Sequence, residues 1–108
     1  MSITELLVKN KIIFKKSQTI ELKRYTKSRS LSSIVGVDLN SRNTIVFSRE
    51  AKTKFLKKDA ESLDGLANVV LNDIKVICRR KIFFSTSEIC SKSYDFLKEN
   101  GWVIYASM

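Results

Sequence analysis

Apolar and polar residues alternate near the N-terminus, the pattern typical of strands that are half-buried in a sheet. Residues 19–25 place Ile20 and Leu22 on one side and Glu21, Lys23 and Tyr25 on the other. Residues 12–14 are apolar, and four polar residues separate the two segments. The pattern therefore predicts a β-hairpin of residues 12–14 with 19–25.

A second hairpin is predicted immediately afterwards. Residues 34–38 and 44–48 are rich in β-branched and apolar side chains, and residues 39–43 contain the Asn and Ser residues that suit a turn. Residues 53–57 fit either a further strand or the beginning of the next helix, and propensity does not decide between them.

Beyond residue 58 the apolar period becomes that of an amphipathic helix. The residues on its apolar face are Leu63, Leu66, Ala67, Val70 and Ile74. Asp59, Glu61 and Asp64 lie near its start, where acids stabilise the helix dipole, and a metal-binding role is the alternative for them.

The C-terminal part predicts a strand, a helix and a strand. Residues 76–84 are strand-like, Ser85 and Glu88 have capping-box spacing at a helix start, and Asn100–Gly101 suits a helix end. Residues 102–106 form an apolar strand. The helix of about a dozen residues is long enough for a parallel crossover.

These elements predict an α+β fold: a basic antiparallel β-meander, then the amphipathic helix and the C-terminal β-α-β unit. The chain has 108 residues, which suits one hydrophobic core. It contains no proline, so we expect a single domain over residues 1–108.

The residue inventory excludes several chemistries. The chain has no histidine, which excludes Ser-His-Asp and Cys-His catalytic arrangements and histidine-containing zinc sites. Cys78 and Cys90 form no CxxC pair, and three scattered glycines provide no phosphate-binding loop. We favour a non-enzymatic protein without a cofactor or metal, and we interpret both cysteines as reduced, small buried hydrophobes.

The expected location of the protein is cytoplasmic. No apolar run approaches the ~18 residues of a membrane span, so we expect no membrane contact. Two isolated cysteines in a lysine-rich chain without a secretory signal are usual in a reducing compartment.

Positive charge is the strongest indication of function. The net charge is +9, and the first 58 residues hold 14 of the 20 basic and 4 of the 11 acidic residues. A phosphate backbone requires such charges together with hydrogen-bond donors and a ring for stacking. The candidate nucleic-acid-binding residues are Lys11, Lys15, Lys16, Lys23, Arg24, Tyr25, Lys27 and Arg29. The alternative is an adaptor or inhibitor that docks this basic face on an acidic protein.

Two short segments resemble parts of nucleases. Residues 34–44 resemble the first hairpin of RNase H-like nucleases of the Holliday-junction-resolvase type, which implies a metal-binding role for Asp38, although Asn40 replaces the expected turn glycine. Glu21 and Lys23 have the E-x-K spacing that ends a strand in many restriction-type nucleases, but residues 11–18 lack the accompanying acid, so we interpret this pair as solvated neighbours on a strand.

The aromatic residues of the C-terminal unit predict a buried core. They are Phe83, Phe84, Phe96, Trp102 and Tyr105. The apolar final strand, residues 102–106, could instead pair with another chain if it lies at a sheet edge, which motivates a homodimer hypothesis.

Overall fold

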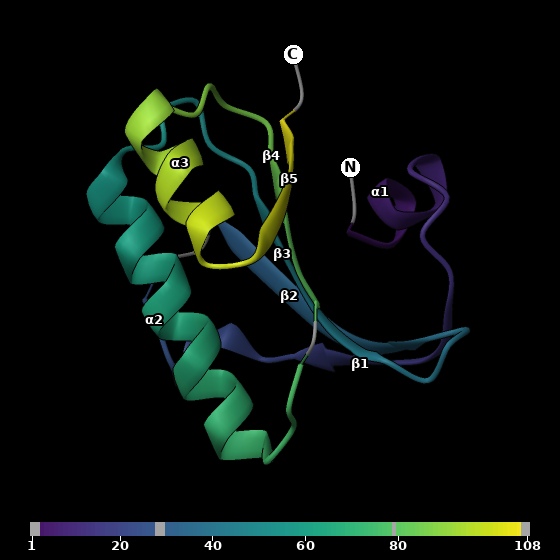
Figure 1. Cartoon of the computed structure of the whole chain (residues 1–108). Coiled ribbons are helices and arrows are strands. Elements are labelled where there is room, and N and C mark those ends of the chain that lie inside the picture. The colour runs from purple at the N-terminus through teal and green to yellow at the C-terminus, as the bar shows by residue number, and fades with distance from the viewer. Residues whose placement is uncertain (1–2, 28–29, 79, 107–108) are drawn as a thin grey trace.

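The computed structural model describes residues 3–27, 30–78 and 80–106 (Figure 1). Its elements, in chain order, are α1 (Ile3–Lys9), β1 (Phe14–Ile20), the short 3₁₀ helix η1 (Leu22–Arg24), β2 (Leu31–Asp38), β3 (Asn43–Arg49), α2 (Lys57–Ile74), β4 (Arg80–Ser85), α3 (Ser91–Glu99) and β5 (Trp102–Ala106). Within these residues, no helix combines the length and apolar character needed to cross a membrane.

The five strands form one mixed sheet in the order β1-β2-β3-β4-β5. The strands β1, β2 and β3 are antiparallel neighbours, whereas β3, β4 and β5 run parallel. The predicted α+β fold is confirmed, and so is the parallel β-α-β unit. Residues 76–78, however, lie outside β4, so the strand predicted for residues 76–84 begins too early.

Helices lie on both faces of the sheet (Figure 1). On one face, α2 and α3 cover a buried cluster that consists of Ile20, Leu22, Val35, Ile45, Phe47, Phe55, Ala60, Leu63, Ala67, Val70, Phe83, Leu97 and Trp102. On the other face, α1 contributes to a second cluster of Leu7, Ile34, Val46, Ile82 and Phe84. Because successive strand residues point to opposite faces, the apolar runs of β3 and β4 supply both clusters.

The hairpin predicted for residues 12–14 and 19–25 is wrong. One strand, β1, runs from Phe14 to Ile20 through the polar residues between them. Since β1 is an edge strand, its middle residues face solvent, while Phe14 and Ile20 anchor its ends against the two clusters. Leu22 reaches the core from η1 rather than from a strand.

A close contact explains the glycine in β2. A Cβ atom on Gly36 would lie 2.5 Å from Cγ of the Phe14 ring, closer than any side-chain contact allows. Gly36 therefore permits Phe14 to lie flat against β2 and to anchor the N-terminal end of β1.

The first turn of α2 settles the ambiguity of residues 53–57. Phe55 forms an isolated β-bridge, and the helix begins at Lys57. The carboxylate of Asp59 accepts a hydrogen bond from the backbone N–H of Leu56 at 2.9 Å, so this acid caps the helix as the dipole interpretation predicts.

The beginning of α3 differs from the prediction. Ser85 remains in β4, where its buried hydroxyl donates to the carbonyl of Ser87 at 3.0 Å. The helix begins at Ser91, and Sγ of Cys90 caps it by accepting from the N–H of Ser93 at 3.4 Å. Burial at the end of β4 therefore outweighs the capping-box spacing. Both cysteines are free and half-buried, so they are less buried than predicted.

Candidate nucleic-acid interface

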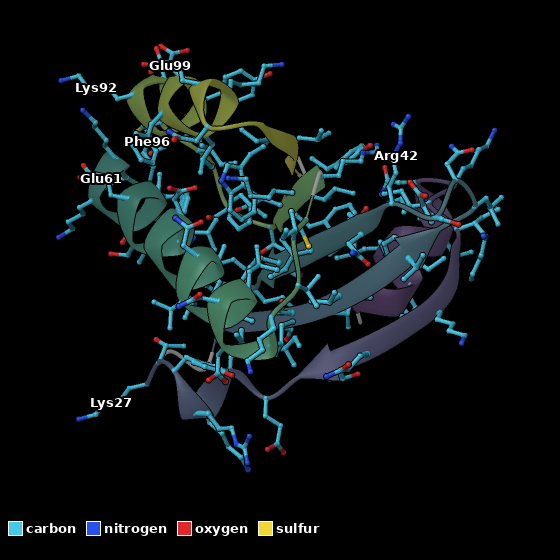
Figure 2. The ribbon with its side chains drawn as sticks, turned by 60° about the horizontal axis from the view of Figure 1, so that its bottom comes forward. Lys27, Arg42, Glu61, Lys92, Phe96 and Glu99 are labelled. Atoms are coloured by element: carbon cyan, nitrogen blue, oxygen red, sulfur yellow. The ribbon has the colours of Figure 1, made fainter. Side chains whose placement is uncertain are left out.

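The predicted basic residues form two exposed groups, one before and within the first half of β1 and one after its C-terminal end. The turn-end group is Lys11, Lys15 and Lys16, and the η1 group is Lys23, Arg24 and Lys27. Lys16 is the third residue of β1, so the part of the strand between it and Ile20 is about 13 Å long. Figure 2 shows Lys27 far from Arg42, which lies at the β2–β3 turn. Arg29, also predicted, lies outside the described residues.

Lys15 of the turn-end group is hydrogen-bonded to the β2–β3 turn. Nζ of Lys15 donates to Oγ of Ser41 at 2.9 Å. Arg42 is exposed on the same turn and adds a cation that the predicted set did not include. Lys15 and Arg42 therefore place two positive charges at the same turn.

The hydroxyl of Tyr25 is hydrogen-bonded to α2. This hydroxyl donates to Oδ2 of Asp73 on α2 at 2.5 Å. This hydrogen bond, with desolvation and the Asp73 charge as smaller causes, raises the pKa of Tyr25 above its ordinary value. The ring is thereby held at the edge of a groove.

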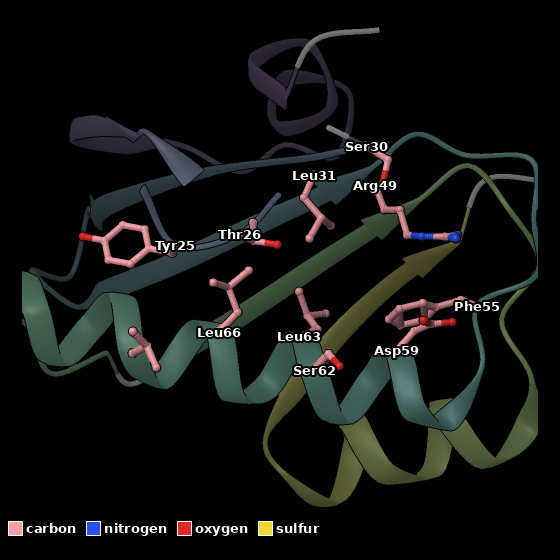
Figure 3. Close-up of a pocket in the computed structure, with 11 residues that line it drawn as sticks. Tyr25, Thr26, Ser30, Leu31, Arg49, Phe55, Asp59, Ser62, Leu63 and Leu66 are labelled. Atoms are coloured by element: carbon pink, nitrogen blue, oxygen red, sulfur yellow. The ribbon is translucent and has the colours of Figure 1, made fainter. Parts of the chain in front are cut away.

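This groove runs along α2 and encloses about 500 Å³ (Figure 3). The residues that line it are Tyr25, Thr26, Ser30, Leu31, Arg49, Phe55, Asp59, Ser62, Leu63, Leu66 and Val69. They come from α2, from the segment between η1 and β2, from the adjoining ends of β2 and β3, and, in the case of Phe55, from the connection between β3 and α2. Its volume lies in the range of small-molecule sites, and its lining combines apolar walls with a few polar groups.

Arg49 is the cation of the groove. Its Nη1 donates to the carbonyl of Thr53 at 3.0 Å and to Oγ of Ser87 at 2.6 Å, and its Nη2 donates to Oγ1 of Thr53 at 2.9 Å. The guanidinium carbon lies 5.3 Å from the ring centroid of Phe55. Sequence analysis missed Arg49; the available signal was a cation placed directly after the buried run of β3.

The nuclease-like carboxylates have local roles in the structure. Oδ1 of Asp38 accepts from the backbone N–H groups of Asn40 and Arg42, each at 2.9 Å, and so closes the β2–β3 turn. Glu21 precedes η1 rather than lying on a strand, so the strand neighbourhood predicted for Glu21 and Lys23 is wrong. Across the described ranges, no three His, Cys, Asp or Glu side chains gather as a metal site.

Comparison with known proteins identifies a likeness of fold. No family model and no curated protein sequence matches the chain. A solved structure of EndoMS in its apo form is similar, with a TM-score of 0.55 and 14% sequence identity. The match covers 96% of this chain and 44% of the EndoMS chain, so this chain spans less than half the length of that protein.

Proposed function

We propose that the protein binds nucleic acid through the phosphate backbone, without catalysing a reaction. The observation that carries this proposal is the pair of exposed basic groups along β1 and η1, since such charges release counterions from a polyanion.

The distribution of charge favours phosphate contacts over base readout. The two groups follow one edge strand and the short helix after it instead of converging on a pocket. A polyanion laid along β1 would contact both groups, with Lys15 and Lys16 at one end and Lys23 and Arg24 at the other. Contacts of this kind set position and affinity but carry little sequence information.

The test is to measure binding to short single- and double-stranded DNA and RNA at increasing salt concentration. Fluorescence anisotropy monitors the binding, with and without magnesium. We expect the logarithm of the affinity to fall linearly with the logarithm of salt, by about 0.9 per neutralised phosphate for duplex DNA and about 0.7 for single strands.

Paired charge reversals locate the contacts. One variant carries Lys15→Glu and Lys16→Glu, a second carries Lys23→Glu and Arg24→Glu, and the control carries Lys92→Glu and Lys98→Glu on α3 (Lys92 is labelled in Figure 2). All six side chains are exposed, and each pair changes the net charge equally. We expect each β1 pair to weaken binding at least about tenfold and to flatten the salt slope, and the control to have a much smaller effect.

Two outcomes contradict the proposal. If all four nucleic acids bind no tighter than about millimolar near physiological salt, the basic groups serve an acidic protein partner. If magnesium causes cleavage that Asp38→Asn abolishes, the protein is a nuclease and the resemblance of residues 34–44 is functional.

A further inference from the structure

We propose that the groove along α2 binds one nucleotide of a single strand, with its phosphate on Arg49 and its base between β2 and α2. This inference rests on the proposed nucleic-acid binding and names a site for it that the basic groups of β1 do not include.

Within the described residues, two N–H donors of the Arg49 guanidinium have no hydrogen-bond partner. Arginine has five N–H donors, and the structure accounts for three of them, two on Thr53 and one on Ser87. Thr53 accepts hydrogen bonds from both Nη1 and Nη2, so it occupies the edge of the guanidinium between these two nitrogens. The two remaining donors, Nε–H and one Nη2–H, share the side edge. That edge matches two oxygens of a phosphate or a carboxylate.

The charge of Arg49 is not neutralised by an ion pair. In the described ranges, the ion pairs join Lys54 with Glu88 and Lys81 with Asp64. The hydrogen-bond partners of Arg49 are neutral oxygens, and Phe55 covers one face of the guanidinium. The cation is therefore held in one orientation while its charge remains available to an anion.

One carboxylate lines the same groove and must be taken into account. Asp59 lies toward the Arg49 end of the groove in Figure 3, with Oδ2 accepting from the N–H of Leu56. Its negative charge opposes the approach of a phosphate. It therefore lowers the affinity for an anion without removing the open edge of Arg49.

The walls beyond Arg49 suit a flat, weakly polar body. Figure 3 shows Leu31 directed toward α2 and Leu63 and Leu66 directed toward the strands, so that leucines face one another across the groove. Ser62 adds a hydroxyl at the side. A nucleobase has apolar faces and polar edges, and it fits such a slot once it has left a duplex stack.

The geometry selects a single strand over a duplex. The groove is lined along α2 from Asp59 to Val69, about 15 Å of helix, which is long enough for one nucleotide and its adjoining phosphate. Paired bases are stacked inside a duplex and present no free face to a slot. Duplex binding would therefore use the exposed groups of β1 and leave the groove empty.

The experiment compares four probes with the full chain: a nucleoside monophosphate, the same nucleoside, inorganic phosphate and a short single strand. Isothermal titration measures the first three, and displacement of a labelled single strand by the mononucleotide shows whether the two share a site. We expect the mononucleotide to bind at least about tenfold tighter than phosphate or nucleoside, because only it uses both parts of the groove.

Four variants assign the binding to Arg49. Arg49→Gln removes the charge, and Arg49→Lys keeps the charge but loses the two-donor edge, so both should weaken mononucleotide binding at least about tenfold. Lys52→Gln, an exposed cation close in sequence that does not line the groove, is the matched control and should have little effect. Asp59→Asn keeps an oxygen for the Leu56 cap and removes the repulsion, so it should strengthen binding about threefold.

Failure of this inference is distinguishable from failure of the proposed function. If single strands bind, the β1 charge reversals weaken them and Arg49→Gln does not, the groove is not the site. Equal binding of phosphate and mononucleotide also overturns it. If the mononucleotide binds but no strand does, the assignment to a strand is overturned together with the proposed function. Because Asp59→Asn is expected to gain affinity, misfolding of Arg49→Gln cannot imitate the full pattern.

Discussion

Two half-buried cations on the α2 side of the sheet have opposite surroundings. Nζ of Lys81, on β4, lies 3.3 Å from Oδ1 of Asp64, which also accepts from Nε1 of Trp102 at 3.0 Å. Arg49, at the end of β3, is surrounded by the neutral oxygens of Thr53 and Ser87. The first cation is neutralised within the fold and joins α2 to β4 and β5. The second retains its charge beside an open groove.

The presence or absence of a counter-charge distinguishes a cation that stabilises the fold from a cation that can bind an anion. Both side chains contact an aromatic ring, Trp102 for Lys81 and Phe55 for Arg49, so the ring does not discriminate between them. The two cations differ in whether a carboxylate is paired with them. Lys81 and Asp64 satisfy each other, whereas the hydrogen bonds of Arg49 orient it without cancelling its charge.

Removal of the carboxylate should produce the largest loss of stability. Asp64→Ala leaves the Lys81 ammonium and the Trp102 N–H without their shared acceptor in a half-buried position, so the free energy of unfolding should fall by about 2–3 kcal/mol. Urea unfolding followed by the fluorescence of Trp102, the one tryptophan of the chain, measures this. The exposed acid Asp95 provides the control, since Asp95→Ala should change stability little. A loss below about 1 kcal/mol for Asp64→Ala would show that the cluster contributes no more than a surface ion pair.

Substitution of Arg49 should reduce the free energy of unfolding less than substitution of Asp64. Arg49→Gln removes hydrogen bonds to neutral oxygens and leaves no buried charge behind, so the free energy of unfolding should fall by about 1 kcal/mol. Millimolar phosphate should raise the melting temperature of the wild type more than that of Arg49→Gln, because a ligand stabilises the state that binds it. An equal rise in both proteins would mean that phosphate acts elsewhere.

The side-chain hydroxyl of Thr44 is buried without a hydrogen-bond partner among the described residues, in contrast to the hydrogen-bonded Lys81 and Arg49. Thr44 on β3 is 1% exposed, and its Oγ1 has no hydrogen-bond partner within the described part of the chain. Thr44→Val keeps the shape and removes the unsatisfied oxygen, so it should stabilise the protein by about 0.5–1 kcal/mol. Thr86→Val is the matched control: its hydroxyl accepts from the N–H of Ala51 at 3.2 Å, and its loss should destabilise. If both variants destabilise, solvent reaches Thr44.

Hydrophobic period was enough to predict the elements that have both sequence periodicity and a buried face. The second hairpin, the amphipathic helix and the parallel β-α-β unit are confirmed, because their apolar residues fill the two clusters. β1 could not be found in this way, since an edge strand with Lys15 and Lys16 in its exposed middle carries no period. α1 was missed for a related reason: it has seven residues, too few for a helical period to be distinguished.

The candidate site also has parts that could be predicted from the sequence and parts that could not. Exposed cations near β1 were predictable because charge is visible in composition. Their separation into two groups was not predictable, since it depends on β1 being one strand instead of a hairpin. Arg49 and its groove depend on the approach of α2 and of the segment after η1, which no local pattern records.

The two cysteine thiols, Cys90 and Cys78, also differ in their surroundings: Cys90 has hydrogen-bond partners, whereas the main influence on Cys78 is burial. Hydrogen bonds with Ser93, from its side chain first and its backbone next, lower the pKa of Cys90, whereas burial raises the pKa of Cys78 to about 11. A lower pKa gives more thiolate at neutral pH, so iodoacetamide should modify Cys90 faster. The rate at Cys90 should level off at a lower pH than the rate at Cys78, which should still be rising near pH 10. Mass spectrometry of the two peptides measures both rates, and Ser93→Ala should move the Cys90 profile to higher pH while leaving Cys78 unchanged. Equal rates in the native protein would show that the Ser93 hydrogen bonds do not stabilise the thiolate.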